Sequence, residues 1–193
     1  MNVIEDAGKA GNGTLFLSGH YSNWEFIAFS FSKLFKYSLK IIAKPQGSRS
    51  LNKKINSYRT LGGNEIIQTG ISLRAIFKSL DQNDFICFLI DQSAHPDYSV
   101  YVNFLGQKTA SFSGPAKIAL KKRCELILGY GIRDKNYKYD VYFSKIDYSD
   151  IVDYNEENII VLTQRIQTEF EKIVLADPGQ WLWLHKRFKH VRN

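Results

Sequence analysis

Residues 85–90 constrain the fold more than any other part of the chain, because they read Phe-Ile-Cys-Phe-Leu-Ile without a polar side chain. A strand that faces water on one side alternates apolar and polar residues, whereas a strand covered on both faces is apolar throughout. The run is also much shorter than the ~18 apolar residues that a membrane span needs. We therefore predict a central strand here, in a sheet that carries helices on both faces.

The rest of the chain alternates between strand-like and helix-like segments with short connections. We expect strands at residues 15–18, 39–43, 65–68, 126–130 and 137–146, a short extended piece at 100–104, and helices at 23–34, 51–61, 72–80, 115–122 and 158–175. The segment 137–146 alternates in polarity, as an edge strand does. This order predicts an α/β fold with a mainly parallel central sheet flanked by helices and right-handed crossovers. Because no repeat or linker interrupts it, we expect residues 1–193 to form one domain.

Composition narrows the class of protein further. The chain has 193 residues, of which 14% are aromatic, so it can bury a substantial core and is not globally disordered. Cys87 and Cys124 lie in apolar, strand-like contexts, which is typical of buried thiols in a reducing compartment. His95 and His185 have no partner at a metal-ligand spacing, so we expect no metal.

The chain is basic, with a formal net charge of +7. Such a surface favours phosphate-rich or acidic partners, namely nucleic acid, anionic lipid or an acidic carrier protein. Nucleic acid receives little support, because we find no RNA-binding signature, zinc finger or densely basic helix face. The segment before Gly13 is short, polar and glycine-rich and does not read as a signal peptide.

A histidine and a carboxylate, His20 and Glu25, follow the apolar run that ends at Ser18. A histidine at the end of a strand can act as a base, and a carboxylate that reaches back across the strand-to-helix turn can orient its ring. The alternative is structural, because Ser22 and Glu25 also have the spacing of a capping box, with Ser22 as the N-cap. Asp91 follows the central strand as His20 follows the first one. Since function gathers at the carboxyl ends of parallel strands, we predict that His20 and Asp91 share a site.

Several blocks of the chain resemble one known family. Residues 19–25, reading Gly-His-Tyr-Ser-Asn-Trp-Glu, resemble the HX4E block of the lipid A biosynthesis late acyltransferases, within the lysophospholipid and glycerolipid acyltransferase superfamily. Five further blocks have counterparts in the same order: Ala43-Lys44-Pro45 with Arg59 before Gly62, Leu89-Ile90-Asp91-Gln92, Val102-Asn103-Phe104-Leu105-Gly106, Ser113-Gly114-Pro115-Ala116 and Pro178 to Arg187. The resemblance covers nearly all of the chain.

The resemblance implies a glycerolipid acyltransferase-like fold and an O-acyltransferase that uses an acyl thioester. His20 would be the general base, with Glu25 fixing its tautomer. The donor would be acyl-carrier protein or acyl-CoA, the acceptor a hydroxyl of a glycolipid such as a lipid A precursor, and no cofactor or metal would be needed. The expected substrate-binding residues are Asn23, Lys44, Arg59, Asp91 and Gln92.

Alternatives stay open for most of these residues. Lys44 and Arg59 would bind phosphate on the acceptor or be solvated charges, and Lys44 stands where the family usually has Arg. Asp91 would orient an acceptor hydroxyl or a neighbouring basic residue, or else cap the turn after its strand. The same alternatives apply to Gln92. Two other functions also remain: acylation of another bacterial lipid, such as a lysophospholipid or aminolipid, and a non-catalytic basic domain that binds lipid or carrier protein.

Location is a further expectation from the resemblance. Family members carry a longer stretch before the histidine, with a membrane helix, so this chain is expected to lack that anchor. We expect it at the cytoplasmic face of the bacterial inner membrane, bound peripherally or through the missing segment. The stretch 181–190 mixes aromatic and basic residues and would lie on anionic lipid, unless Trp181, Leu182 and Leu184 pack into the core.

Overall fold

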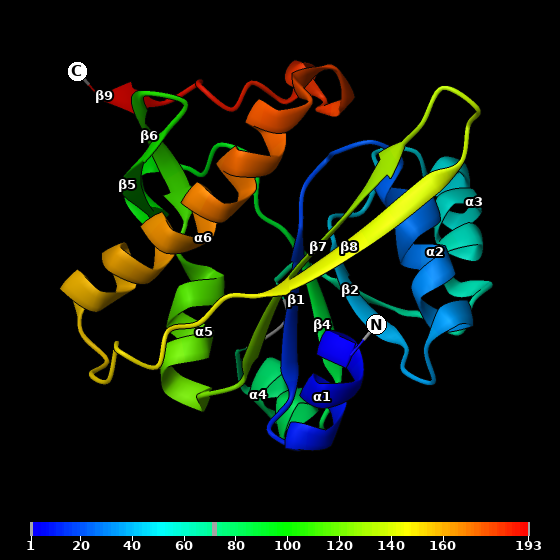
Figure 1. The fold of residues 1–193 in the computed structure, drawn as a ribbon, viewed down its shortest axis with the longest axis horizontal. Coiled ribbons are helices and arrows are strands. Elements are labelled where there is room, and N and C mark those ends of the chain that lie inside the picture. Colours follow the sequence, from blue (N-terminus) through cyan, green and yellow to red (C-terminus); the bar gives the residue numbers. More distant parts are fainter. Residues whose placement is uncertain (1, 71–72, 193) are drawn as a thin grey trace.

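The computed structural model describes residues 2–70 and 73–192, and a parallel β-sheet forms its centre (Figure 1). In the described part, the six strands of this sheet are β1 (Thr14–Ser18), β2 (Leu39–Ala43), β3 (Glu65–Gln68), β4 (Phe85–Leu89), β7 (Glu125–Arg133) and β8 (Tyr139–Lys145). Their order is β3-β2-β4-β1-β7-β8, and only the edge strand β8 runs antiparallel to its neighbour. The predicted α/β fold, the central place of β4 and the edge place of β8 are confirmed.

Helices cover both faces of the sheet, as the apolar run in β4 requires. They are α1 (Asn2–Ala10), α2 (Trp24–Leu34), α3 (Arg49–Thr60), α4 (Leu73–Asp81), α5 (Gly114–Lys122) and α6 (Glu156–Ala176). Along β1, Leu15 and Leu17 pack with residues of α4, α5 and α6, whereas Phe16 packs with residues of α1 and α2. Figure 1 shows α5 and α6 on one side of the strands and α2 with α3 on the other. None of the helices in residues 2–70 and 73–192 is long and apolar enough to cross a bilayer.

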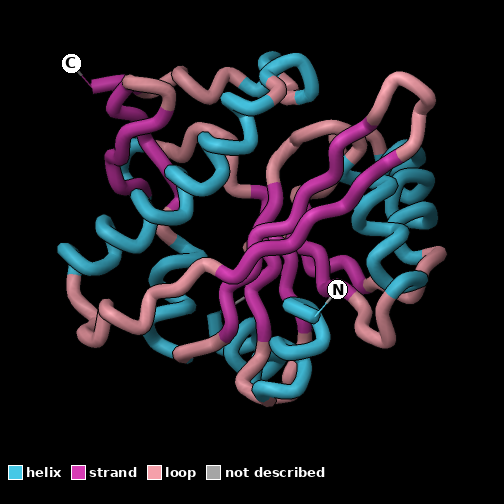
Figure 2. The backbone as a smooth tube through the Cα atoms, viewed as in Figure 1, coloured by secondary structure: helices cyan, strands magenta, loops and turns pink. Residues whose placement is uncertain are grey.

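A small antiparallel sheet lies beside α6 and consists of β5 (Ser99–Phe104), β6 (Gln107–Phe112) and β9 (Val191–Arg192) (Figure 2). The tight turn between β5 and β6 uses Leu105 and Gly106, whose φ angles are 49° and 74°. The sequence predicted only an extended piece at 100–104. It missed β6 and β9 because β6 is half polar and β9 is two residues that pair with a strand far away in sequence.

The structure contains a first helix that was not predicted, and α3 and α6 begin two residues earlier than expected, at Arg49 and Glu156. No element was predicted before Leu15, but α1 forms there because Ile4 and Ala7 are buried against the sheet. The helix expected at 72–80 begins at Leu73, and Ser72 itself lies outside the described residues.

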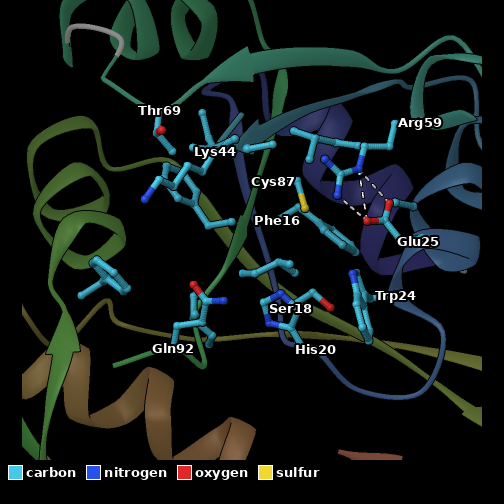
Figure 3. A pocket seen from close by; sticks show the side chains of 18 of the residues that line it. Phe16, Ser18, His20, Trp24, Glu25, Lys44, Arg59, Thr69, Cys87 and Gln92 are labelled. Carbon is cyan, nitrogen blue, oxygen red and sulfur yellow. Dashed lines mark hydrogen bonds and ion pairs between the residues drawn. The ribbon is translucent and has the colours of Figure 1, made fainter. Parts of the chain in front are cut away.

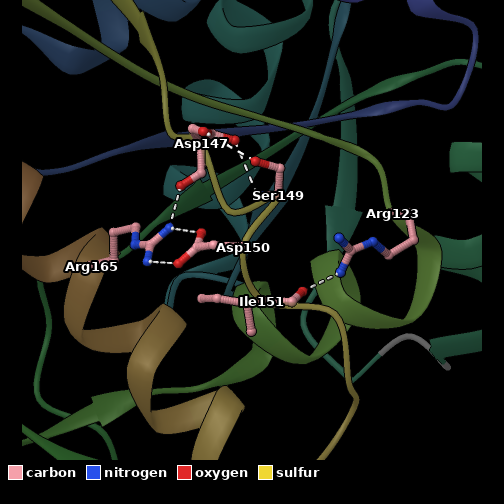
Figure 4. A network of polar contacts seen from close by, with 6 residues as sticks. All are labelled: Arg123, Asp147, Ser149, Asp150, Ile151 and Arg165. Carbon is pink, nitrogen blue, oxygen red and sulfur yellow. Dashed lines mark hydrogen bonds and ion pairs between the residues drawn. The ribbon is translucent and has the colours of Figure 1, made fainter.

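A network of polar contacts holds the connection from β8 to α6 (Figure 4). Arg165 on α6 donates two hydrogen bonds to the Asp150 carboxylate, of 2.7 and 2.8 Å, and one to the carbonyl oxygen of Asp147. Arg123, just after α5, donates to the carbonyl oxygen of Ile151 at 2.7 Å. The loop is thereby tied to the helices on either side of it, and α6 is held where its buried face meets the sheet.

Gly19, the residue before His20, packs against α6, so a substitution at this position tests that packing. A methyl group at Gly19 would overlap the ring of Phe170, which is fully buried on α6. We expect Gly19→Ala to lower the free energy of unfolding by about 1–3 kcal/mol through overpacking, measured by urea denaturation. Gly47→Ala is the matched control, because a methyl group there meets nothing within 4 Å. Equal stability of the two variants would contradict the packing described.

Candidate active site

His20 and Asp91 meet at the carboxyl edge of the sheet because β1 and β4 are neighbours in register. The last pair of that register is Ser18 with Leu89, and the backbone N–H of Ile90 donates to the carbonyl oxygen of Ser18 at 2.9 Å. Two residues beyond this pair lie His20, which follows β1, and Asp91, which follows β4. The prediction that these two residues lie together is confirmed.

The carboxylate of Asp91 accepts three N–H groups in the buried space between the strands. Its Oδ1 lies 2.8 Å from Nδ1 of His20, and its Oδ2 accepts from the backbone N–H of His20 and from Nε1 of Trp181, both at 2.9 Å. The Asp91 side chain is 0% exposed and that of His20 is 11% exposed. Burial raises the pKa of Asp91, but the hydrogen bonds and charge of His20, with the Trp181 N–H, more than offset it and hold this pKa below its ordinary value.

This contact determines where the proton of the imidazole sits. An ionised carboxylate only accepts hydrogen bonds, so the neutral form of His20 has its hydrogen on Nδ1 and a lone pair on Nε2. Within residues 2–70 and 73–192, Nε2 makes no hydrogen bond. His20 lines a pocket, so a basic nitrogen is available to a molecule bound there.

The prediction that Glu25 contacts His20 is wrong, because the carboxylate of Glu25 forms an ion pair with Arg59. Nε of Arg59 lies 3.1 and 2.9 Å from the two oxygens of Glu25, and Nη2 makes a further short contact with Oε1 (Figure 3). The capping alternative is also wrong. Asn23, not Ser22, is the N-cap of α2 and accepts from the N–H of Phe26 at 3.1 Å, while Ser22 has a φ of 53°.

The other residues that were predicted to bind substrate differ in their contacts and in whether they line the pocket. Arg59 was expected at a phosphate or in solvent, but its side chain is only 15% exposed, and the hydrogen bond with Glu25 raises its pKa. The side-chain oxygen of Asn23 caps α2, and its expected role in binding substrate stays a prediction. Lys44 lines the pocket and is exposed, which leaves its phosphate role a prediction. Gln92 also lines the pocket, where its Nε2 lies 3.1 Å from Nδ1 of His185.

The pocket is a mostly apolar cavity of about 440 Å³ at the carboxyl ends of β1, β2 and β4. Its apolar wall includes Phe16, Ile27, Ile41, Cys87, Phe88 and Leu89. In Figure 3, Lys44 and Thr69 lie at the end of the pocket away from His20 and Trp24. Burial raises the pKa of the Cys87 thiol to about 12, so this sulfur is a protonated part of the wall at neutral pH. In the described residues, no cluster of three or more His, Cys, Asp or Glu side chains could hold a metal ion.

The segment after α6 completes the site, and sequence reasoning missed this role. Tyr21 and Trp181 form an isolated antiparallel bridge, and the N–H of Leu182 donates to the carbonyl oxygen of His20 at 2.9 Å. The ring of His185 consequently lies with its centroid 3.8 Å from that of His20. The sequence indicated a resemblance for the block 178–187 and a lipid contact or core packing for 181–190, but no role beside His20. Nothing local in it indicates which strand end it covers.

Arg187 binds the segment after α6 to the small sheet. The residue is 2% exposed, and its guanidinium donates to the carbonyl oxygen of Ala110 at 2.7 Å and to the hydroxyl of Ser111 at 2.5 Å, both on β6. Burial lowers the pKa of Arg187 to about 10, although the charge of Asp91 acts in the opposite direction. The small sheet therefore fixes the chain that carries Trp181 and His185.

Fold and site together define an α/β protein with a strand-end imidazole, held by a buried carboxylate, in an apolar pocket. A family model described as bacterial lipid A biosynthesis acyltransferase matches residues 1–190, nearly the whole chain. The chain belongs to this family, and membership implies acyltransferase activity. Comparison with curated proteins finds no match.

The buried Asp91 gives a prediction for stability against pH. A carboxyl whose pKa is lower in the folded state contributes stability above its unfolded pKa of about 3.9, and this contribution disappears as pH falls through the folded pKa. We expect Asp91→Asn to be clearly less stable than the wild type at pH 7 in urea denaturation, with a difference that shrinks as the pH is lowered from about 4. Asp97→Asn, at a carboxylate that is 73% exposed, is the control and should follow the wild type. A difference that stays constant between pH 7 and pH 3 would contradict this account.

Proposed function

We propose that the protein transfers a fatty acyl group from an acyl thioester to a hydroxyl group of a glycolipid acceptor such as a lipid A precursor. The donor would be acyl-carrier protein or acyl-CoA, and His20 would be the general base. One observation carries the proposal: Nδ1 of His20 is bound at 2.8 Å by a fully buried carboxylate, which leaves a basic Nε2 at an apolar pocket.

The reaction follows from the state of this imidazole. A neutral alcohol is a poor nucleophile and needs a base as it attacks. Nε2 of His20 takes the hydroxyl proton while the oxygen forms a bond to the thioester carbonyl carbon, and the buried Asp91 stabilises the imidazolium that results. The tetrahedral intermediate then collapses, the C–S bond breaks, and the thiolate takes the proton from Nε2. No covalent enzyme intermediate is needed, because the thioester is already activated.

The pocket supports an acyl substrate. Its mostly apolar wall suits an alkyl chain, since an apolar chain gains about 25 cal/mol for each Å² removed from water. Lys44 at the opposite end from His20 would then bind a phosphate on the acceptor or on the donor. Glu25 and Arg59 would act as wall residues, because their ion pair ties α2 to α3 along one side of the pocket.

Two alternatives differ in what they need from these residues. Another bacterial lipid, such as a lysophospholipid or an aminolipid, would use the same base with a different acceptor. A non-catalytic basic domain that binds lipid or carrier protein would use the net charge of +7 but has no use for a buried carboxylate behind a histidine. The geometry of His20 and Asp91 therefore favours an enzyme.

The exposed residues beside the pocket support binding at an anionic membrane surface. Trp183 is 53% exposed and Leu184 is 84% exposed, with Lys186 and Lys189 close by in the chain and also exposed. The expectation that Leu184 packs into the core is wrong, whereas Trp181 is buried as expected. Since His185 follows Leu184 in the chain and lines the pocket, this surface lies beside the site that a lipid acceptor would occupy. Peripheral attachment to the cytoplasmic face of the inner membrane fits this arrangement.

Removal of the base tests the proposed chemistry. We expect His20→Ala to remain folded by circular dichroism and to lose about 10²–10⁴-fold in turnover, the usual contribution of general base catalysis. Release of free thiol from acyl-carrier protein or acyl-CoA in the presence of a glycolipid acceptor measures the rate. His95→Ala, at a histidine whose side chain is 66% exposed and outside the pocket lining, should keep wild-type turnover. A folded His20→Ala protein with unchanged turnover rules the proposal out.

The membrane contact has a separate test. Replacing Trp183 and Leu184 together by Ala should reduce flotation with vesicles of anionic lipid by about tenfold, because two exposed apolar side chains no longer enter the interface. Leu175→Ala, at a residue that is 63% exposed on α6, is the control. Equal flotation of both variants and the wild type would show that this surface is not the contact.

A further inference from the structure

Two histidines of the pocket lining, His20 and His185, lie against each other, and two consecutive residues bind them. The ring centroids of His20 and His185 are 3.8 Å apart with the planes inclined by 54°. Asp91 binds Nδ1 of His20 at 2.8 Å, and the next residue, Gln92, places its Nε2 at 3.1 Å from Nδ1 of His185. The mechanism proposed above uses only the first of these pairs.

The two partners impose opposite tautomers on the two rings. The Asp91 carboxylate only accepts, so His20 has its hydrogen on Nδ1. The amide nitrogen of Gln92 only donates, so Nδ1 of His185 must be the acceptor, and a neutral His185 has its hydrogen on Nε2. Burial lowers the pKa of His185, and the neighbouring His20 lowers it further, which keeps this ring neutral at physiological pH.

The Nε2–H group of His185 is a donor without an acceptor in the part of the chain that the structure describes. His185 lines the same pocket as His20, so the Nε2–H donor of His185 and the basic Nε2 of His20 belong to one cavity. A thioester carbonyl attacked by the acceptor hydroxyl develops negative charge on its oxygen. A fixed N–H group close to the base is the kind of group that stabilises such an oxygen.

On the basis of the proposed acyl transfer, we infer that His185 donates a hydrogen bond from Nε2 to the carbonyl oxygen of the acyl thioester and that Gln92 positions it for this role. As the acceptor oxygen bonds to the carbonyl carbon, its proton passes to Nε2 of His20 and the carbonyl π electrons move onto the oxygen bound by His185. When the C–S bond breaks, those electrons re-form the carbonyl and the thiolate takes the proton from His20. His185 keeps its own proton throughout.

A neutral donor suits this place for an electrostatic reason. When His20 becomes an imidazolium, a second charged ring 3.8 Å away would oppose it, whereas a neutral ring with an N–H group does not. The Asp91-Gln92 pair thus prepares one histidine to accept a proton and the other to keep one. A structural role alone would require a ring at position 185 and would not depend on its Nε2–H group.

Two substitutions at position 185 separate these roles. His185→Phe keeps a ring but removes the donor, and it should lower kcat by about 10²–10³-fold with KM nearly unchanged, the usual loss for one oxyanion donor. His185→Gln retains an amide N–H at the position of Nε2 and should recover a large part of that loss. His95→Phe, the same exchange at an exposed histidine outside the pocket lining, is the control. A folded His185→Phe enzyme with wild-type kcat would overturn the inference, as would a His185→Gln enzyme no better than His185→Phe.

The tautomers can be measured without any substrate. Nitrogen-15 NMR of the histidine-labelled protein at pH 7.5 should show His185 with its hydrogen on Nε2 and His20 with its hydrogen on Nδ1. Gln92→Met removes the amide donor and should leave His185 as a mixture of tautomers, with a kcat between those of the wild type and His185→Phe. A wild-type His185 with its hydrogen on Nδ1 would overturn the inference whatever the activity. A wild type that transfers no acyl group from either thioester would instead contradict the proposed function, which keeps the two failures distinct.

Discussion

The rest of the site depends on one buried carboxylate that has to be satisfied. Asp91 is fully buried, and an ionised carboxylate in such a place is tolerated only when hydrogen bonds replace the water it has lost. Its three donors come from the loop after β1 and from the segment after α6, so one side chain joins regions 71 and 90 residues away in the sequence. The end of β4, the turn at His20 and Trp181 are therefore a single unit, and the pocket opens in front of it.

The two acidic residues of the site have different roles because their surroundings differ. Glu25 is 40% exposed and meets a guanidinium, so it forms an ion pair that holds two helices together. Asp91 is shielded from water and meets only N–H groups, which makes it suited to fix the orientation and tautomer of an imidazole. Charge alone would have allowed either carboxylate to orient His20. The strand register decides, because it places Asp91 directly beside His20 at the sheet edge.

Much of this architecture could be predicted from local patterns, and the exceptions have a physical cause. The apolar run of β4 indicated a central strand, and the rule that functional residues gather at the carboxyl ends of parallel strands predicted that His20 and Asp91 lie together. The partner of Glu25 could not be predicted, because Arg59 reaches it only after α2 and α3 pack against each other. For the same reason, β9, Trp181 and His185 were missed as parts of the fold or the site: each is positioned by contacts with residues distant in the sequence.

The central claim is that Asp91, and not Glu25, prepares His20 as the base, and acyl-transfer rates of two amide variants measure this directly. Asp91→Asn puts an amide N–H against one of the three N–H donors and favours the wrong tautomer of His20, so kcat/KM should fall by about 10⁴-fold, the order expected when a carboxylate that orients a catalytic histidine becomes an amide. Glu25→Gln keeps a hydrogen-bond acceptor for Arg59 and should lose less than about tenfold. Nearly full activity in a folded Asp91→Asn protein, with a large loss in Glu25→Gln, would contradict the account.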